Sequence, residues 1–133
     1  MKAHIVREPR CALVWNYHDE SGLAALRRAA GDAHLTLRPV GNGDLGATVG
    51  DLCTGKPTPA AAPLIAVPDR PALILSGLSH QTGELGAFLD QLQAAGVTLP
   101  LRAMVTPTSK GWTLAQLLLE LNSEHDAVQG DKA

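Results

Sequence analysis

The sequence predicts an α/β fold: a small three-layer sandwich of about four mainly parallel strands, in the order 2-1-3-4, with helices on both faces. Two observations support it. Short apolar runs alternate with helical patterns along the chain, and this alternation is typical of crossovers that build a parallel sheet. The runs are also almost continuously apolar, as expected of strands that are buried on both sides.

The predicted strands are residues 11–16, 35–40, 72–76 and 101–106. Each is a run of aliphatic and β-branched residues of the usual strand length.

Three of these strands are followed by a clear helical pattern. Residues 19–33 open with capping candidates and place leucines and alanines at helical spacing. Residues 82–95 repeat this design, and Gly96 supplies the helix stop. The final helix begins at Thr113, which forms a capping box with Gln116.

A single domain of residues 1–126 is expected, because 133 residues suffice for one real core. Residues 56–71 contain five prolines and are interpreted as an internal connection, not a boundary, because each flanking half holds only two strands. Residues 127–133 lack apolar periodicity and are predicted to form a frayed tail. No internal repeat beyond the βα alternation is evident.

Composition restricts the possible partners. The net charge is -2 and only 18% of residues are charged, so no basic field favours nucleic acid. No apolar run approaches the roughly 20 residues of a membrane span, and no signal peptide is evident, so a cytoplasmic location is expected. The two cysteines and five histidines are scattered, so neither a metal nor a cofactor is predicted.

Residues 41–57 imitate two nucleotide-binding motifs. Gly41, Gly43 and Gly46 have the spacing of a dinucleotide-binding turn, but no long helix and no acidic strand follow them. Residues 50–57 resemble a phosphate-binding loop until Pro57 stands where Ser or Thr is required. We therefore predict a short helix with glycines at both ends, capped by Gly55.

Two catalytic patterns are also incomplete. Residues 77–81 approach a nucleophile elbow, but Gln81 replaces the final glycine. A phosphoacceptor receiver domain would need an aspartate at the end of the third strand, where Ser76 stands.

The strand order predicts one candidate site. It makes the first and third strands neighbours, with their helices on opposite faces and a crevice at their carboxyl ends. We expect polar side chains from three loops to gather there, with Ser76 and Lys110 beside them: Asn16, Tyr17, His18, Asp19, Ser79, His80, Thr106 and Thr108.

The carboxyl-terminal segment, residues 101–126, resembles the prokaryotic domain-of-unknown-function family 3783. In that family a strand ends in Thr-Pro-Thr, a Trp follows, and a helix closes with Glu-His. The matching positions are Thr106, Pro107, Thr108, Trp112, Glu124 and His125. The resemblance extends more weakly upstream and implies no reaction.

Three functional hypotheses remain. The first is a regulatory or accessory module that binds a protein partner or a small anionic ligand at the polar edge. The second is an undescribed enzyme that uses His18 or His80 there. The third is an assembly component, such as a homodimer, that pairs through an open sheet edge at residues 35–38 or through the proline-rich segment.

Overall fold

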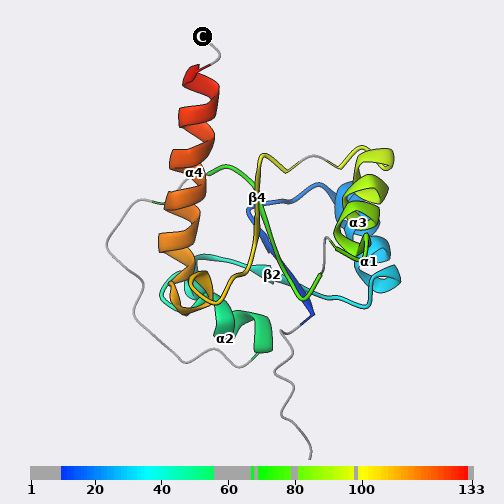
Figure 1. Ribbon diagram of the computed structural model, residues 1–133, viewed down its shortest axis with the longest axis horizontal. Coiled ribbons are helices and arrows are strands. Elements are labelled where there is room, and N and C mark those ends of the chain that lie inside the picture. The colour runs from blue at the N-terminus through cyan, green and yellow to red at the C-terminus, as the bar shows by residue number, and fades with distance from the viewer. Residues whose placement is uncertain (1–9, 56–66, 68, 79–80, 98, 132–133) are drawn as a thin grey trace, which may run out of the picture.

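A computed structural model describes residues 10–55, 67, 69–78, 81–97 and 99–131. It confirms the predicted α/β class and the strand order β2-β1-β3-β4 (Figure 1). The strands are β1 (Cys11–Trp15), β2 (Thr36–Val40), β3 (Ala72–Ser76) and β4 (Leu101–Met104). The helices are α1 (Glu20–Asp32), α2 (Val49–Thr54), α3 (Glu84–Ala94) and α4 (Leu114–Asp131), with 3-10 turns η1 (Asn42–Asp44) and η2 (Ser109–Gly111).

The helix boundaries follow the predicted signals. Asp19 caps α1 by accepting the Gly22 N–H at 2.7 Å. Gly55 ends α2 with φ at 76°, a left-handed conformation that favours glycine. The short helix predicted after residue 43 is divided into η1 and α2, and α4 continues past Asp126 to Asp131.

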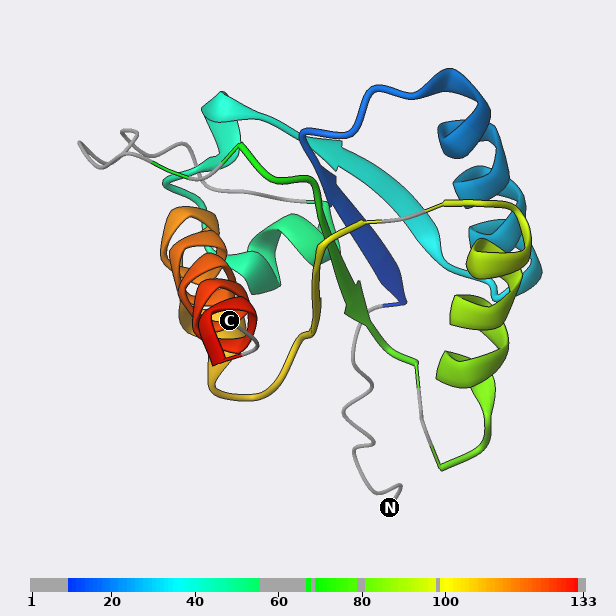
Figure 2. The same cartoon turned by 90° about the horizontal axis from the view of Figure 1, so that it is seen from above.

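Two apolar layers enclose the sheet, which confirms the three-layer sandwich. On one face α2 and α4 pack over Leu13 and Ile74, while on the other α1 and α3 pack over Val14 and Leu73. Figures 1 and 2 show the two helix pairs on opposite sides of the strands. The helices that follow β1 and β3 therefore share one face, whereas the sequence predicted opposite faces.

Strand directions explain that correction. β1 pairs with β2 in parallel and β3 with β4 in parallel, but β1 and β3 are antiparallel. Cys11 lies opposite Ser76, and Trp15 lies opposite Ala72. The sheet is thus mainly parallel, with one antiparallel pair at its centre.

The structure also contains an internal repeat that the sequence pattern did not reveal. The first half, β1-α1-β2-η1-α2, and the second half, β3-α3-β4-η2-α4, have the same element order, and they meet at the antiparallel β1–β3 pair. Thr48 and Thr113 form an isolated antiparallel bridge, and each caps its following helix by accepting an N–H three residues on. The two halves are thus related by an approximate twofold axis.

The repeat extends to side-chain hydrogen bonds. In the first half the Gly41 N–H donates to the Asp44 carboxylate at 2.9 Å. In the second half the Thr106 N–H donates to the Ser109 hydroxyl at 2.9 Å, at the equivalent place after β4. The two halves are therefore equivalent at these loop positions as well as in their secondary structure.

Candidate functional site

The predicted site residues occupy two opposite edges of the sheet. Asn16, Tyr17, His18 and Asp19 follow β1, whereas Thr106 and Thr108 follow β4. Because β1 runs antiparallel to β3 and β4 runs parallel to β3, the carboxyl ends of β1 and β4 point in opposite directions. The single crevice predicted from a parallel β1–β3 pair is therefore not formed. Ser79 and His80 lie outside the described residues.

At the first edge, the side chain of Asn16 holds a neighbouring segment in place. Its Nδ2 donates to the Asp69 carbonyl, and its backbone has a left-handed φ of 53°. The Asn16 Oδ1 lies 3.2 Å from the His18 Nε2. This contact orients an exposed imidazole, but a neutral amide is neither a base nor a nucleophile that could form a catalytic pair with it.

Tyr17 and Asp19 anchor the start of α1. Asp19 is the helix cap, and Tyr17 packs so closely on Gly22 that a Cβ there would lie 1.7 Å from the phenol oxygen. Burial raises the pKa of Tyr17, and the nearby Asp19 carboxylate adds to this effect. These contacts give both side chains a structural role.

At the second edge, Thr106 and Ser109 close the loop reciprocally. The Thr106 N–H donates to the Ser109 Oγ at 2.9 Å, and the Ser109 N–H donates to the Thr106 Oγ1 at 3.0 Å. Ser109 is buried, whereas Thr108 and Lys110 are exposed, and the Thr108 side chain makes no capping hydrogen bond. The loop therefore uses the Thr106 and Ser109 groups internally and leaves Thr108 and Lys110 exposed.

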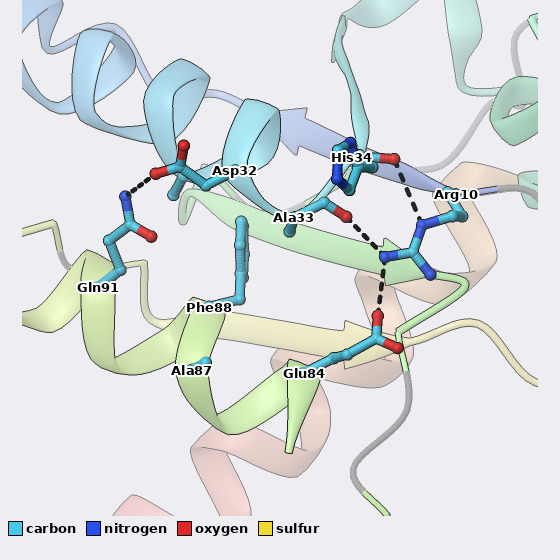
Figure 3. A pocket seen from close by; sticks show the side chains of 9 residues that line it. Arg10, Asp32, Ala33, His34, Glu84, Ala87, Phe88 and Gln91 are labelled. Atoms are coloured by element: carbon cyan, nitrogen blue, oxygen red, sulfur yellow. Dashed lines mark hydrogen bonds and ion pairs between the residues drawn. The ribbon is translucent and has the colours of Figure 1, made fainter. Parts of the chain in front are cut away.

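A separate groove lies between α1 and α3, with a cavity volume of about 420 Å³. None of the predicted site residues lines it. Its walls combine charged and small apolar side chains, which Figure 3 shows facing one another across the two helices: Arg10, Ala29, Asp32, Ala33, His34, Glu84, Ala87, Phe88 and Gln91.

Arg10 closes one end of the groove. Its guanidinium donates to the carbonyls of Ala33 at 2.6 Å and Gly77 at 2.8 Å, and it pairs with the Glu84 carboxylate at 2.7 Å. Arg10 thus links the end of α1 to the first turn of α3, as Figure 3 shows. Through the Gly77 carbonyl it also reaches the end of β3. Hydrogen bonding to Arg10 lowers the pKa of Glu84.

A second polar contact closes the other end. The Gln91 amide on α3 donates to the Asp32 carboxylate on α1 at 3.0 Å. Between the two polar contacts, the ring of Phe88 and the methyl groups of Ala33 and Ala87 form an apolar centre (Figure 3). The groove is thus a short apolar depression bounded by hydrogen-bonding groups.

The sequence pattern did not single out this groove. Arg10 stands in a basic amino-terminal segment, and its long-range partners cannot be deduced from neighbouring residues. One signal was available: Ala33 and Ala87 are small residues where longer apolar side chains would fill the space between packed helices.

The described residues contain neither a metal-site cluster nor a membrane-spanning helix. Within residues that the structure describes, no three His, Cys, Asp or Glu side chains gather into a possible metal site. No helix in the same part of the chain is long and apolar enough to cross a membrane.

Residues 71–128 match the family described as "Domain of unknown function (DUF3783)". This match confirms the resemblance predicted from the sequence, and it spans β3, α3, β4 and most of α4, which is the second half of the internal repeat. Comparisons with curated proteins and with solved structures gave no match.

Proposed function

We propose that this chain, whose residues 71–128 match the DUF3783 family, is a cytoplasmic accessory module that binds an apolar side chain of a partner protein. The observation that carries the proposal is the α1–α3 groove, with its apolar centre between the Arg10–Glu84 and Asp32–Gln91 contacts. Pockets of a few hundred Å³ with an apolar lining and a few polar groups at the rim are the usual form of a recognition site.

The charges around the groove favour a neutral apolar group over an anion. The Arg10 guanidinium is engaged by carbonyl groups and a carboxylate, so it has little capacity left for a ligand. The Glu84 and Asp32 carboxylates at the rim would repel a second negative charge. An apolar side chain would bury the surface of Ala33 and Ala87 without disturbing either polar contact.

The Thr106–Thr108 loop is the alternative place for a small anion. Its Thr106 hydroxyl and the N–H groups of Thr106 and Ser109 are already used within the loop. Thr108 and Lys110 are exposed and would have to supply the affinity. This is a smaller set of groups than the groove offers, so we assign the partner to the groove.

The enzyme hypothesis has less support from the geometry. His18 is exposed and lies beside the Asn16 amide. Neither a carboxylate nor a nucleophilic hydroxyl is recorded as a hydrogen-bond partner of His18 in the described part of the chain, and Thr106 lies at the opposite edge. An accessory role requires none of these pairings.

Selection of a phage-displayed random heptapeptide library on the immobilised protein tests the proposal. We expect enriched peptides that share one bulky apolar residue, and we expect Ala87→Glu to weaken their binding by at least about tenfold, because it places a charge in the apolar centre. Affinity is measured by fluorescence polarisation of labelled peptides.

Ala94→Glu is the matched control, since Ala94 is an exposed alanine on the same helix that does not line the groove. Its affinity should stay within about twofold of the wild type. Equal losses in the two variants, or no enrichment of apolar residues, would contradict the groove assignment.

A further inference from the structure

A cluster of polar side chains lies within the apolar layer between the sheet and α2. Cys11 is on β1, Arg38 on β2, Ser76 on β3 and Cys53 on α2. Cys11 is 0% exposed, Ser76 1% and Cys53 4%, so three of the four are buried. Cys11 and Ser76 are register partners, and Arg38 is paired with Leu13 on the same side of the sheet as Cys11.

The two cysteines are free thiols in the same buried apolar cluster, and they lie within hydrogen-bonding reach of each other. Hydrogen bonding from Cys53 lowers the pKa of Cys11, and the positive charge of Arg38 acts in the same direction. Hydrogen bonding to Cys11 and burial raise the pKa of Cys53. Cys11 is therefore the thiol that ionises first, while Cys53 keeps its proton.

Two further polar atoms belong to the cluster. Within the described residues, the buried Arg38 Nε has no hydrogen-bond partner. The buried Ser76 hydroxyl lies beside the Cys53 thiol and acts to lower its pKa, against the larger effects of Cys11 and burial. The outer end of the guanidinium lies over Gly55, where an added Cβ would come within 2.5 Å of Nη2. Unpaired buried polar atoms cost stability, so the fold alone does not account for this cluster.

The second half of the molecule provides an internal control. When β1 is aligned with β3 and β2 with β4 by their strand registers, Ala72 is equivalent to Cys11, Trp15 to Ser76 and Ala103 to Arg38. The helix caps Thr48 and Thr113 make Leu118 equivalent to Cys53. The same architecture thus accommodates apolar side chains at all four equivalent positions, and three of the four polar residues, Cys11, Arg38 and Cys53, belong to the first half.

We propose that Cys11 and Cys53 are a redox modification site that forms a disulfide on exposure to hydrogen peroxide. The Cys11 thiolate attacks one peroxide oxygen, the O–O bond breaks, and the departing hydroxide takes a proton to become water. The Cys11 sulfenic acid that results is then attacked by the sulfur of Cys53. The S–O bond breaks, and the hydroxyl leaves with the Cys53 proton as a second water. Two thiols and one peroxide therefore give one disulfide and two waters.

The position of Cys53 makes this step accessible. Cys53 is the penultimate residue of α2, a helix of six residues, and the following Thr54 and Gly55 are exposed. Opening of this last turn would admit a molecule as small as peroxide, because helix ends open at low cost in free energy. The disulfide would then tie α2 to the central strand β1.

Mass spectrometry of the intact protein tests the inference. The fully reduced wild type is treated with hydrogen peroxide under native conditions, and we expect a monomer lighter by two hydrogen atoms, with a Cys11–Cys53 linkage in the peptide map. Arg38→Gln should slow the reaction at neutral pH by about fivefold or more, and Arg38→Lys should retain most of the rate, because the positive charge favours the Cys11 thiolate.

Cys53→Ser, which retains the attacking Cys11 thiol, should gain oxygen or form a disulfide-linked dimer in place of the internal bond, whereas Cys11→Ser should stay largely unreacted. Circular dichroism tests whether each variant is folded. If a variant does not fold, the peroxide reaction of the wild type alone tests the proposal. Two unreacted thiols in peroxide-treated wild type, oxygen added to a single cysteine, or dimers of the wild type would overturn the proposal.

Discussion

The two halves of the molecule use one architecture with different interiors. In the first half the positions beneath the short helix α2 hold Cys11, Arg38 and Cys53. In the second half the equivalent positions beneath the longer helix α4 hold Ala72, Ala103 and Leu118. The apolar half shows what the fold requires, and the polar half shows where the sequence departs from that requirement. The departure is thus a better guide to chemistry than any single motif.

The largest test of this comparison is truncation at the equivalent helix positions. Leu118→Ala should lower the free energy of unfolding by about 3 kcal/mol, because it opens a cavity under α4. Cys53→Ala should lower it by about 1 kcal/mol, because a thiol is smaller and leaves less space. Urea unfolding of the reduced proteins measures both values. Losses of equal size would mean that packing at the two positions contributes equally to stability.

A second test compares the two helix caps, which should behave alike. Thr48 accepts the Asp51 N–H at 3.3 Å, and Thr113 accepts the Gln116 N–H at 3.2 Å. Thr48→Ala and Thr113→Ala should each lower the free energy of unfolding by about 1 kcal/mol, since each leaves one N–H of a first turn without its partner.

The same urea titrations report the cap effects, with Thr54→Ala as the control. Thr54 is an exposed residue whose hydroxyl donates to a carbonyl within its own helix. If Thr113→Ala lowers the free energy of unfolding several times more than Thr48→Ala does, the two halves differ in their helix caps as well as in their interiors.

The sequence predicted the strands, their order and the helix caps because these depend on local patterns. The apolar runs at Cys11–Trp15 and Ala72–Ser76 identify buried strands directly. The direction of β3 relative to β1 depends on the course of residues 56–71, which carry no periodic pattern that fixes it. The predicted crevice depended on that direction, because Asn16 and Thr106 lie at the same end of the strands only if β1 and β3 are parallel.

Only a small part of the internal repeat is visible in the sequence. Thr48-Val49 and Leu52 in α2 have the same spacing as Thr113-Leu114 and Leu117 in α4, and a glycine stands two residues before each threonine. The other equivalent positions differ in chemistry, so the similarity becomes clear only when the strand registers align the halves. The α1–α3 groove was missed for a related reason, since Arg10 meets its partners only through tertiary structure.

The smallest expected effect concerns the two ends of the α1–α3 groove, of which one is closed by an ion pair and the other by a hydrogen bond between an amide and a carboxylate. Hydrogen bonding to Arg10 lowers the pKa of Glu84 below its ordinary value of 4.5. A carboxyl group with a lowered pKa in the folded state stabilises the fold above its unfolded pKa, and this contribution is lost as the pH falls through the folded value. Glu84→Gln should therefore lose part of the stability that the wild type gains above pH 4.5, and the difference in Tm between them should shrink as the pH falls below that value.

Gln91→Ala serves as the uncharged comparison, because it removes the contact at the other end without removing an ionisable group. Its Tm difference from the wild type should keep a nearly constant value over the same pH range. Thermal melts at a series of pH values in low salt measure both differences, since salt screens the exposed Arg10–Glu84 pair. If the difference in Tm between Glu84→Gln and the wild type also stays constant with pH, the ion pair does not stabilise this end of the groove. The contacts of Arg10 with the Ala33 and Gly77 carbonyls then position the Arg10 side chain on their own.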